Sequence, residues 1–208
     1  MGPSMIGRST NARAPKPAES GFSLIEVMIS MVILTVGLVT LLGVFGLAMA
    51  TTQTSQQNMI AKQLADEALE SIMTARNTSQ LGWDSIQNVG ATNCPNTPPP
   101  ATTCGIFLTG AQPIYFAGAD GIFGTADDAA AGVETLQDPG PDGIYNTTDD
   151  TRIPLTGYQR TILISPLYDA NHVVIQTLRS VTVTIQYTNG QQSQPVTYIV
   201  NSYIAQYL

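Results

Sequence analysis

Two acidic segments of the chain hold the side chains best suited to bind a metal ion. The segments "GADGIFGTADD" (118–128) and "GPDGIYNTTDD" (140–150) are aligned copies, and each places an Asp-Gly pair ahead of a terminal Asp-Asp pair. Carboxylates, a threonine hydroxyl and loop carbonyls are oxygen ligands of the kind that Ca²⁺ prefers, about six to eight at a time. The candidate calcium ligands are Asp120, Asp127, Asp128, Asp142, Asp149 and Asp150.

The same segments have a simpler interpretation as two solvated β-turns, because Asp and Gly are common turn residues. Against this interpretation, each Asp-Asp pair places like charges side by side, which is unfavourable unless a cation neutralises them. The ligand spacing is not that of an EF-hand. Whether Ca²⁺ binds, and at one site or two, stays open. We expect two apolar pairs to anchor the loops on the core: Ile122 with Phe123, and Ile144 with Tyr145.

A single carboxylate, Glu26, stands at the edge of a long apolar run. Residues 27–50 carry no charge and no proline, and the next charged residue is Lys62. An apolar segment of this length can span a bilayer as a helix. Because an ionised side chain at the centre of a span costs about 3 kcal/mol or more, Glu26 needs a partner that neutralises it.

Charge is distributed unevenly along the chain. Arg8, Arg13 and Lys16 precede the apolar run, with Glu19 the only acid there. The positive-inside rule then keeps the N-terminal piece in the cytoplasm and predicts export of the rest. Residues 22–208 hold five Lys or Arg against 14 Asp or Glu. Scattered cations in an acidic chain do not make a phosphate-binding surface, so no nucleic acid contact is expected.

The two cysteines, Cys94 and Cys104, flank a proline-rich loop, "CPNTPPPATTC". In an exported domain they are expected to form a disulfide that closes this short loop. The alternative is two buried thiols. The prolines exclude regular structure over 95–100.

The N-terminus differs from an ordinary secretory signal, in which the cleavage site follows the apolar core. Here the small pair Ser20-Gly21 precedes that core. A cut after Gly21 would remove a basic leader, residues 1–21, and keep the apolar helix. It would also create an amino group on Phe22, four residues before Glu26, and positions four apart share a helix face.

The segment "GFSLIEVMIS" resembles the N-terminal motif of the type IV pilin family, with Gly21, Phe22 and Glu26 at the matching positions. The resemblance implies cleavage between Gly21 and Phe22 by a prepilin peptidase, with N-methylation of Phe22. It also implies that Glu26 pairs with the N-terminal amine of a neighbouring subunit. An uncleaved membrane anchor would not need this pattern.

We expect one long helix over 22–77, membrane-spanning at about 27–50 and amphipathic over 51–77. An apolar stripe at helical spacing predicts packing of the second part on a globular domain, and its members are Ile60, Ala61, Leu64, Ala65, Ala68, Leu69, Ile72 and Met73. The segments "AKQLADEALESIMTARN" and "LRSVTVTIQY…VTYIVNSYIA" resemble minor pilins of the pilus-assembly V type and I-type minor pseudopilins of type II secretion.

Residues 78–208 are expected to form a globular domain with a loop insert at 88–157 and a C-terminal sheet at 158–208. The segments 158–167 and 178–187 are rich in β-branched residues, and the second alternates apolar with polar positions. Asn189-Gly190 predicts a turn before a last strand. The expected fold is therefore α+β, a long helix packed on a small antiparallel sheet, as in pilins.

The resemblance implies a minor structural subunit of a type IV pilus, acting in fibre initiation, tip assembly or modulation. Its partners would be the prepilin peptidase, other pilin or pseudopilin subunits and, before assembly, the inner membrane. The alternatives are a minor pseudopilin of type II secretion and a pilin-displayed, calcium-dependent adhesin. The lone histidine, His172, has no nucleophile pattern with it, so no enzyme and no required cofactor beyond the candidate Ca²⁺ are expected.

Overall fold

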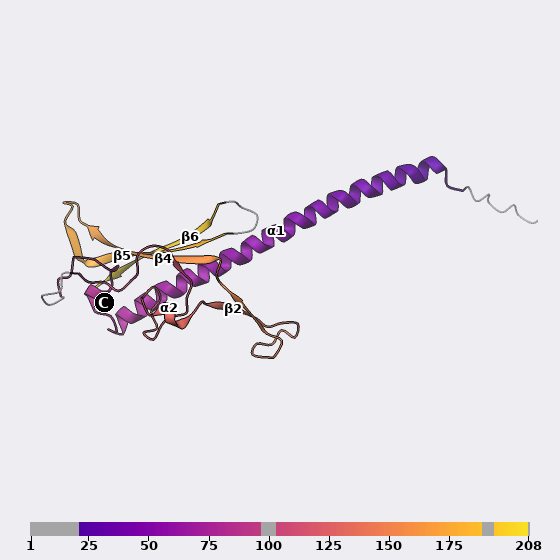
Figure 1. The fold of residues 1–208 in the computed structure, drawn as a ribbon. Helices are drawn as coiled ribbons and strands as arrows, with labels where there is room; N and C mark the ends of the chain where they lie inside the picture. The colour runs from indigo at the N-terminus through magenta and orange to yellow at the C-terminus, as the bar shows by residue number, and fades with distance from the viewer. Residues whose placement is uncertain (1–20, 97–102, 189–193, 208) are drawn as a thin grey trace, which may run out of the picture. The chain divides into compact units, whose positions relative to one another are not determined.

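The computed structural model describes residues 21–96, 103–188 and 194–207. The leader before Gly21 and the Asn189-Gly190 turn lie outside these residues. The order of the elements along the chain is as follows: α1 (Leu24–Asn77), the 3₁₀ helix η1 (Trp83–Ser85), β1 (Gln112–Pro113), α2 (Asp128–Ala131), β2 (Thr135–Asp138), β3 (Thr151–Pro154), β4 (Tyr158–Tyr168), β5 (Val174–Tyr187) and β6 (Val196–Ala205) (Figure 1).

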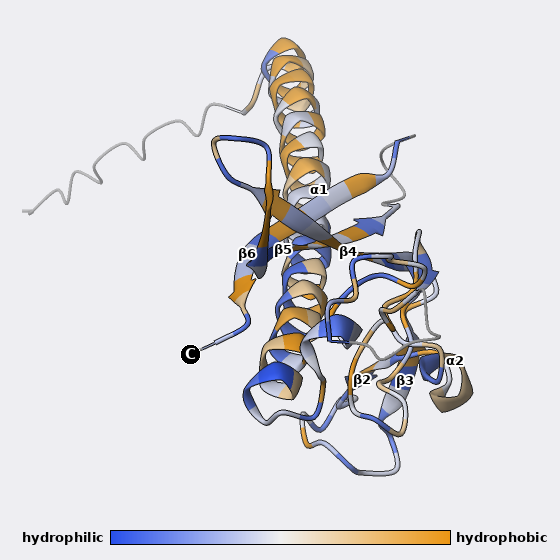
Figure 2. Cartoon of the chain, turned by 90° about the vertical axis from the view of Figure 1, so that its left-hand side faces the viewer, coloured by the Kyte–Doolittle hydropathy of each residue, from blue (hydrophilic) through white to orange (hydrophobic). Residues whose placement is uncertain are grey.

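The chain divides into two compact units, Met1–Ala48 and Met49–Leu208, and α1 contributes to both. In the first unit every described residue from Gly21 to Ala48 is exposed. Most residues of the helix there are hydrophobic, as the colouring by hydropathy shows (Figure 2). The helix is long and apolar enough to cross a membrane, judged by its length and composition. A helix that is apolar all round must be covered by lipid or by other protein.

In the second unit α1 packs on the globular domain through the predicted stripe. The buried helix positions are Ala61, Leu64, Ala65, Ala68, Ile72 and Ala75, while three further stripe members pack partly buried against the core, namely Ile60, Leu69 and Met73. Most of the fully buried positions are alanines, which let the sheet approach the helix backbone closely. The helix ends at Asn77, and Ser79 adopts a left-handed conformation (φ 57°) that closes its last turn.

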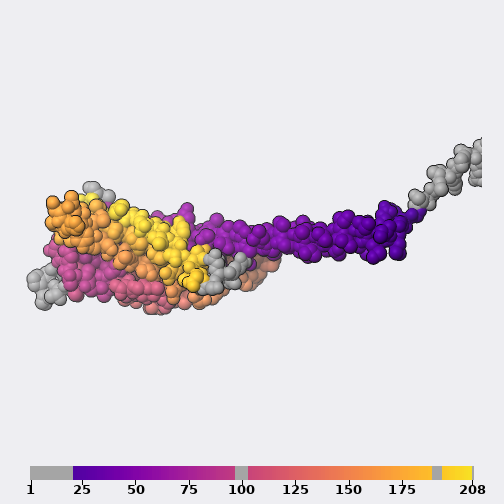
Figure 3. All heavy atoms as spheres, turned by 90° about the horizontal axis from the view of Figure 1, so that it is seen from above, coloured from indigo at the N-terminus to yellow at the C-terminus, as the bar shows by residue number. Residues whose placement is uncertain are grey.

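The main sheet has four strands in the order β1-β4-β5-β6, all antiparallel. Register partners across its centre are Ile162, Val183 and Val200. Alternate residues of β5 face the core, because Val181, Val183 and Ile185 are fully buried while the threonines between them are half-exposed. Strand β6 lies at one edge of the sheet, and Figure 3 shows it in yellow on the surface of the domain.

The predicted loop insert, 88–157, contains more structure than the sequence led us to expect. Strands β2 and β3 form a separate two-stranded hairpin, with Leu136 opposite Ile153. The short strand β1 extends the main sheet by pairing with β4. These elements are only two to four residues long. Their local sequence carries little strand signal, and pairing with another strand holds each of them in place.

Candidate functional site

The candidate processing site lies directly before α1. Gly21, Phe22 and Ser23 are not helical, and α1 begins at Leu24. The Phe22 side chain is 83% exposed. The N–H of Glu26 donates to the carbonyl oxygen of Ser23 at 3.0 Å, which places Glu26 in the first helical turn. The peptide bond between Gly21 and Phe22 therefore lies in accessible, non-helical backbone, the kind that proteases cleave.

In the uncut chain Phe22 precedes the helix, so Phe22 and Glu26 do not share a helix face there. The shared face expected after cleavage stays a prediction. Glu26 gains instead from the helix dipole, which stabilises a carboxylate in the first turn by about 0.3–1 kcal/mol. This gain is smaller than the roughly 3 kcal/mol that an ionised group costs at mid-membrane. The dipole alone therefore does not account for Glu26 if this part of α1 enters an apolar environment.

The family comparison decides what this arrangement is. The model of the prokaryotic N-terminal methylation motif matches residues 16–42, a stretch that includes Gly21, Phe22 and Glu26. This motif is the prepilin signal of type IV pilins and pseudopilins. The N-terminal segment of the chain is therefore a pilin-like signal. No curated protein and no solved structure matches the chain.

A pilin-like signal implies processing by a prepilin peptidase and assembly with other pilin subunits. The long apolar helix indicates membrane anchoring before that assembly. The α+β architecture, a long N-terminal helix followed by a small antiparallel sheet, agrees with the motif. The motif belongs to a structural family rather than to an enzyme family.

The two acidic segments form a second candidate site, and several hydrogen bonds are the same in both. In each copy a threonine hydroxyl donates to the Asp two residues further along the chain: Thr125 to Asp127 and Thr147 to Asp149, both at 2.6 Å. The last Asp of each copy also accepts a backbone N–H at 2.6 Å, from Gly124 in the first copy and from Asn146 in the second.

Hydrogen bonds of this kind stabilise the adjacent negative charges of each Asp-Asp pair. Asp128 is 4% exposed and accepts N–H groups from Gly118, Gly124 and Thr125 at 3.0, 2.6 and 3.2 Å. The Thr125 hydroxyl is the main reason that the pKa of Asp127 lies below its usual range. Both carboxylates of this pair thus accept hydrogen bonds, which offset their mutual repulsion without a bound cation.

The first copy also has the spacing that a cation site requires. Carboxylate oxygens of Asp120, Asp127 and Asp128 all lie within 4.8 Å of one another. Two ligands on opposite sides of a Ca²⁺ ion are separated by about that distance, since each bond is roughly 2.4 Å long. The donor set thus fits Ca²⁺ in type and spacing, although several of its lone pairs already accept hydrogen bonds.

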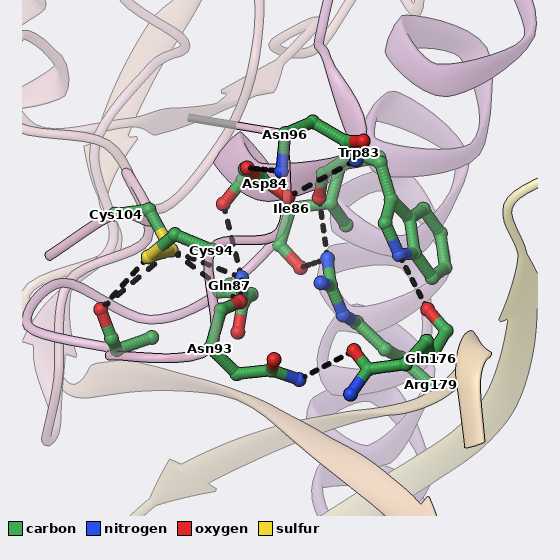
Figure 4. Close-up of a disulfide and its surroundings, with 11 residues drawn as sticks. Trp83, Asp84, Ile86, Gln87, Asn93, Cys94, Asn96, Cys104, Gln176 and Arg179 are labelled. Atoms are coloured by element: carbon green, nitrogen blue, oxygen red, sulfur yellow. Dashed lines mark hydrogen bonds between the residues drawn. A yellow bond between two sulfur atoms is a disulfide. The ribbon is translucent and has the colours of Figure 1, made fainter. Parts of the chain in front are cut away.

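The cysteines form the expected disulfide, Cys94 to Cys104, and the alternative of two buried thiols is wrong. The Nε2 of Gln87 donates to the carbonyl oxygen of Asn93 at 2.8 Å and to Cys104 Sγ at 3.1 Å, on the inner side of the loop (Figure 4). The backbone N–H of Asn96 donates to Asp84 Oδ2 at 2.7 Å. The disulfide thus joins Cys94 to Cys104, and these hydrogen bonds fasten the described residues beside it to the region of η1.

Sequence reasoning missed two buried arginines, Arg160 and Arg179. The Arg160 guanidinium lies 4.5 Å from the ring centre of Phe123, and that of Arg179 lies 4.1 Å from the ring centre of Trp83. Burial lowers the pKa of Arg179 to about 10. Each arginine occupies an inward position of its strand, in alternation with buried Ile or Val, and this alternation was the signal available in the sequence.

Proposed function

We propose that this chain is a minor pilin-like structural subunit of a type IV pilus, acting in fibre initiation, tip assembly or modulation. The observation that carries the proposal is the prepilin signal at the head of one continuous helix, Leu24–Asn77, of 54 residues. Such a helix can serve first as a membrane anchor and then as the part of the subunit that packs in a fibre. Cleavage after Gly21 would switch it from precursor to building block.

The charges of the assembled subunit support this proposal. Cleavage would leave a positive amine on Phe22 and a negative carboxylate on Glu26, both within an apolar surface. Each charge lowers the penalty of burying the other, and a subunit docked out of register would leave both unpaired. The pair would therefore act on the register of assembly more than on its strength.

Two features favour export of the globular domain. The basic residues Arg8, Arg13 and Lys16 lie ahead of the apolar helix, as the positive-inside rule requires for a cytoplasmic N-terminus. The Cys94–Cys104 disulfide is a bond that persists in oxidising compartments. We therefore place the domain outside the inner membrane before assembly and on the fibre afterwards.

A minor pseudopilin of a type II secretion system has the same signal and the same helix. Deletion of the gene distinguishes the two, with piliation and exoprotein export scored in the same strain. The pilus proposal expects fewer fibres and normal export, both restored by the wild-type gene. Normal piliation with loss of exoprotein export would instead show that the chain is a pseudopilin of type II secretion.

The first acidic loop favours a second candidate, a calcium-dependent binding module displayed on a pilin stalk. Carboxylate oxygens of Asp120, Asp127 and Asp128 lie within 4.8 Å of one another, and this spacing supports the second candidate. In this function Asp127→Ala and Asp149→Ala would abolish adhesion and leave fibre assembly intact. Loss of assembly in these variants would instead assign the loops to the fold of the subunit.

A further inference from the structure

The two acidic loops are equivalent in more than their carboxylates. The backbone N–H of Ile122 donates to Asp120 Oδ1 at 2.8 Å, and that of Ile144 donates to Asp142 Oδ1 at the same distance. The glycine that follows each of these Asp residues has a positive φ, 70° at Gly121 and 69° at Gly143. Each loop is therefore held in one conformation by its own hydrogen bonds. This holds for the second loop although most of its residues are exposed.

The apolar pairs of the two loops lie in opposite environments. Ile122 and Phe123 are 1% and 7% exposed, whereas Ile144 and Tyr145 are 61% and 58% exposed. The expectation that both pairs anchor on the core is thus wrong for the second. The second loop, 140–150, lies between β2 and β3 and forms the free end of that hairpin within the second unit (Figure 1).

The first loop shows what surface this motif fits. The N–H of Phe123 donates to Ser71 Oγ on α1 at 3.4 Å, and the Arg160 guanidinium lies 4.5 Å from the centre of the Phe123 ring. The positive charge of Arg160 also interacts favourably with the buried carboxylate of Asp128. Ile122 and Phe123 thus pack in the apolar core that α1 and β4 help to form, and Arg160 of β4 lies beside the acidic loop. We call this part of the core the slot of the first loop.

We propose that the hairpin-tip loop, 140–150, is a preformed docking element that inserts Ile144 and Tyr145 into an apolar slot, next to an arginine or lysine, on a different pilin-like subunit. This inference rests on the proposed function, because a fibre subunit has such neighbours. A rigid loop loses little conformational freedom when it docks. Exposed apolar side chains on a rigid, acidic tip are the arrangement that gains most from such a slot.

A second copy of this chain does not fit the role of partner. Its own slot is filled by Ile122 and Phe123. Among the described residues, the only exposed Lys or Arg are Lys62 and Arg152, and residues 22–208 carry far more acid than base. Two such acidic surfaces repel one another. The partner is therefore a different and less acidic subunit.

The test uses the full-length protein in cells that assemble the fibre. A double variant, Ile144→Ser with Tyr145→Ser, is compared with Val173→Ser, a matched control because Val173 is 60% exposed on the β4–β5 connection. We expect at least about a tenfold loss of the double variant from sheared fibres, since burying two large apolar side chains is worth more than one factor of ten in affinity. The control should enter normally.

A second measurement places the photo-cross-linker p-benzoylphenylalanine at position 145 of an otherwise wild-type chain. The expected product joins this chain to another pilin-like subunit, at a peptide from an apolar surface that includes Arg or Lys. Normal incorporation of the double variant, or cross-links to a second copy alone, would overturn the proposal. Failure of the wild-type chain to enter fibres would instead count against the proposed function, so the two failures are distinguishable.

Discussion

The carboxylates of Glu134 and Glu67 line the same groove between α1 and the hairpin, and their like charges interact unfavourably. Asp66 and Glu70 from α1 line the groove as well, while Arg160 attracts the Glu134 charge from β4. The Oε2 atom of Glu134 is buried and accepts no hydrogen bond among the described residues. Burial first and Glu67 second raise the pKa of Glu134 to about 7.

The pH dependence of stability follows from that pKa. A carboxyl whose pKa rises from 4.5 to about 7 on folding binds its proton more tightly in the folded state. Stability is therefore lost as pH rises through this interval and is constant above it. We expect Glu134→Gln to raise the melting temperature at pH 8 and to have little effect at pH 4.5. Thermal unfolding of the full chain in detergent measures this.

The matched control for Glu134→Gln is Asp138→Asn, which makes the same charge change at an exposed position of β2. Its pH profile should follow that of the wild type. If Glu134→Gln has the same pH dependence of melting temperature as the wild type, folding does not raise the pKa of Glu134. The groove then has no effect on stability through this residue.

Loss of the Cys94–Cys104 disulfide should destabilise the domain. Closing a loop of roughly 10 residues contributes about 3 kcal/mol in the chain-entropy model, or a change of roughly 5–10 °C in melting temperature for a domain of this size. Cys94→Ser with Cys104→Ser should show this loss, and a reductant should produce it in the wild type but not in the variant. A reduced wild type that melts at the oxidised temperature would contradict the prediction.

Calcium binding by the acidic loops stays a prediction that calorimetry can test. Titration of the full chain should show a dissociation constant of about 0.1–1 mM, the range of extracellular calcium modules. Asp127→Ala and Asp149→Ala should weaken binding, whereas Asp66→Asn on the exposed side of α1 should not. If the titration gives no heat of binding and calcium in this range causes no thermal stabilisation, the calcium function is refuted. The loops are then hydrogen-bonded turns only.

Assembly should depend on the charge of Glu26 and not merely on its size. Glu26→Gln and Glu26→Ala should both be cleaved and inserted in the membrane. Both should enter fibres poorly, because an unpaired amine buried in the fibre costs roughly 3–5 kcal/mol. Quantitative blotting of sheared fibres against membrane fractions gives the ratio. Full incorporation of either variant would remove the pairing argument and would not affect the processing site.

The helix and the long strands were predictable because their signals are local and periodic. The end of α1 at Asn77 follows from the turn-forming segment that comes next, and the buried face of β5 follows from the alternation around Val183. The start at Leu24 rather than Phe22 did not follow. The first residues of a helix have N–H groups with no intrahelical partner, so sequence fixes that end poorly.

The burial of the first acidic loop and the exposure of the second could not be predicted from the sequence. The two loops share most of their residues and several internal hydrogen bonds, so the local sequence does not distinguish the environment of Phe123 from that of Tyr145. What separates them is the surface that each meets, and that surface is built from α1 and β4, far away in the chain.

If this chain is a processed, pilin-like subunit, the mass of its mature N-terminus will show the cut. Mass spectrometry of membrane extracts from cells that have a prepilin peptidase should find a chain that begins at Phe22 and carries an N-methyl group. The Gly21→Ala variant, altered on the leader side of the cut, should stay uncleaved. An intact Met1 start for the wild-type chain in those extracts would contradict the account.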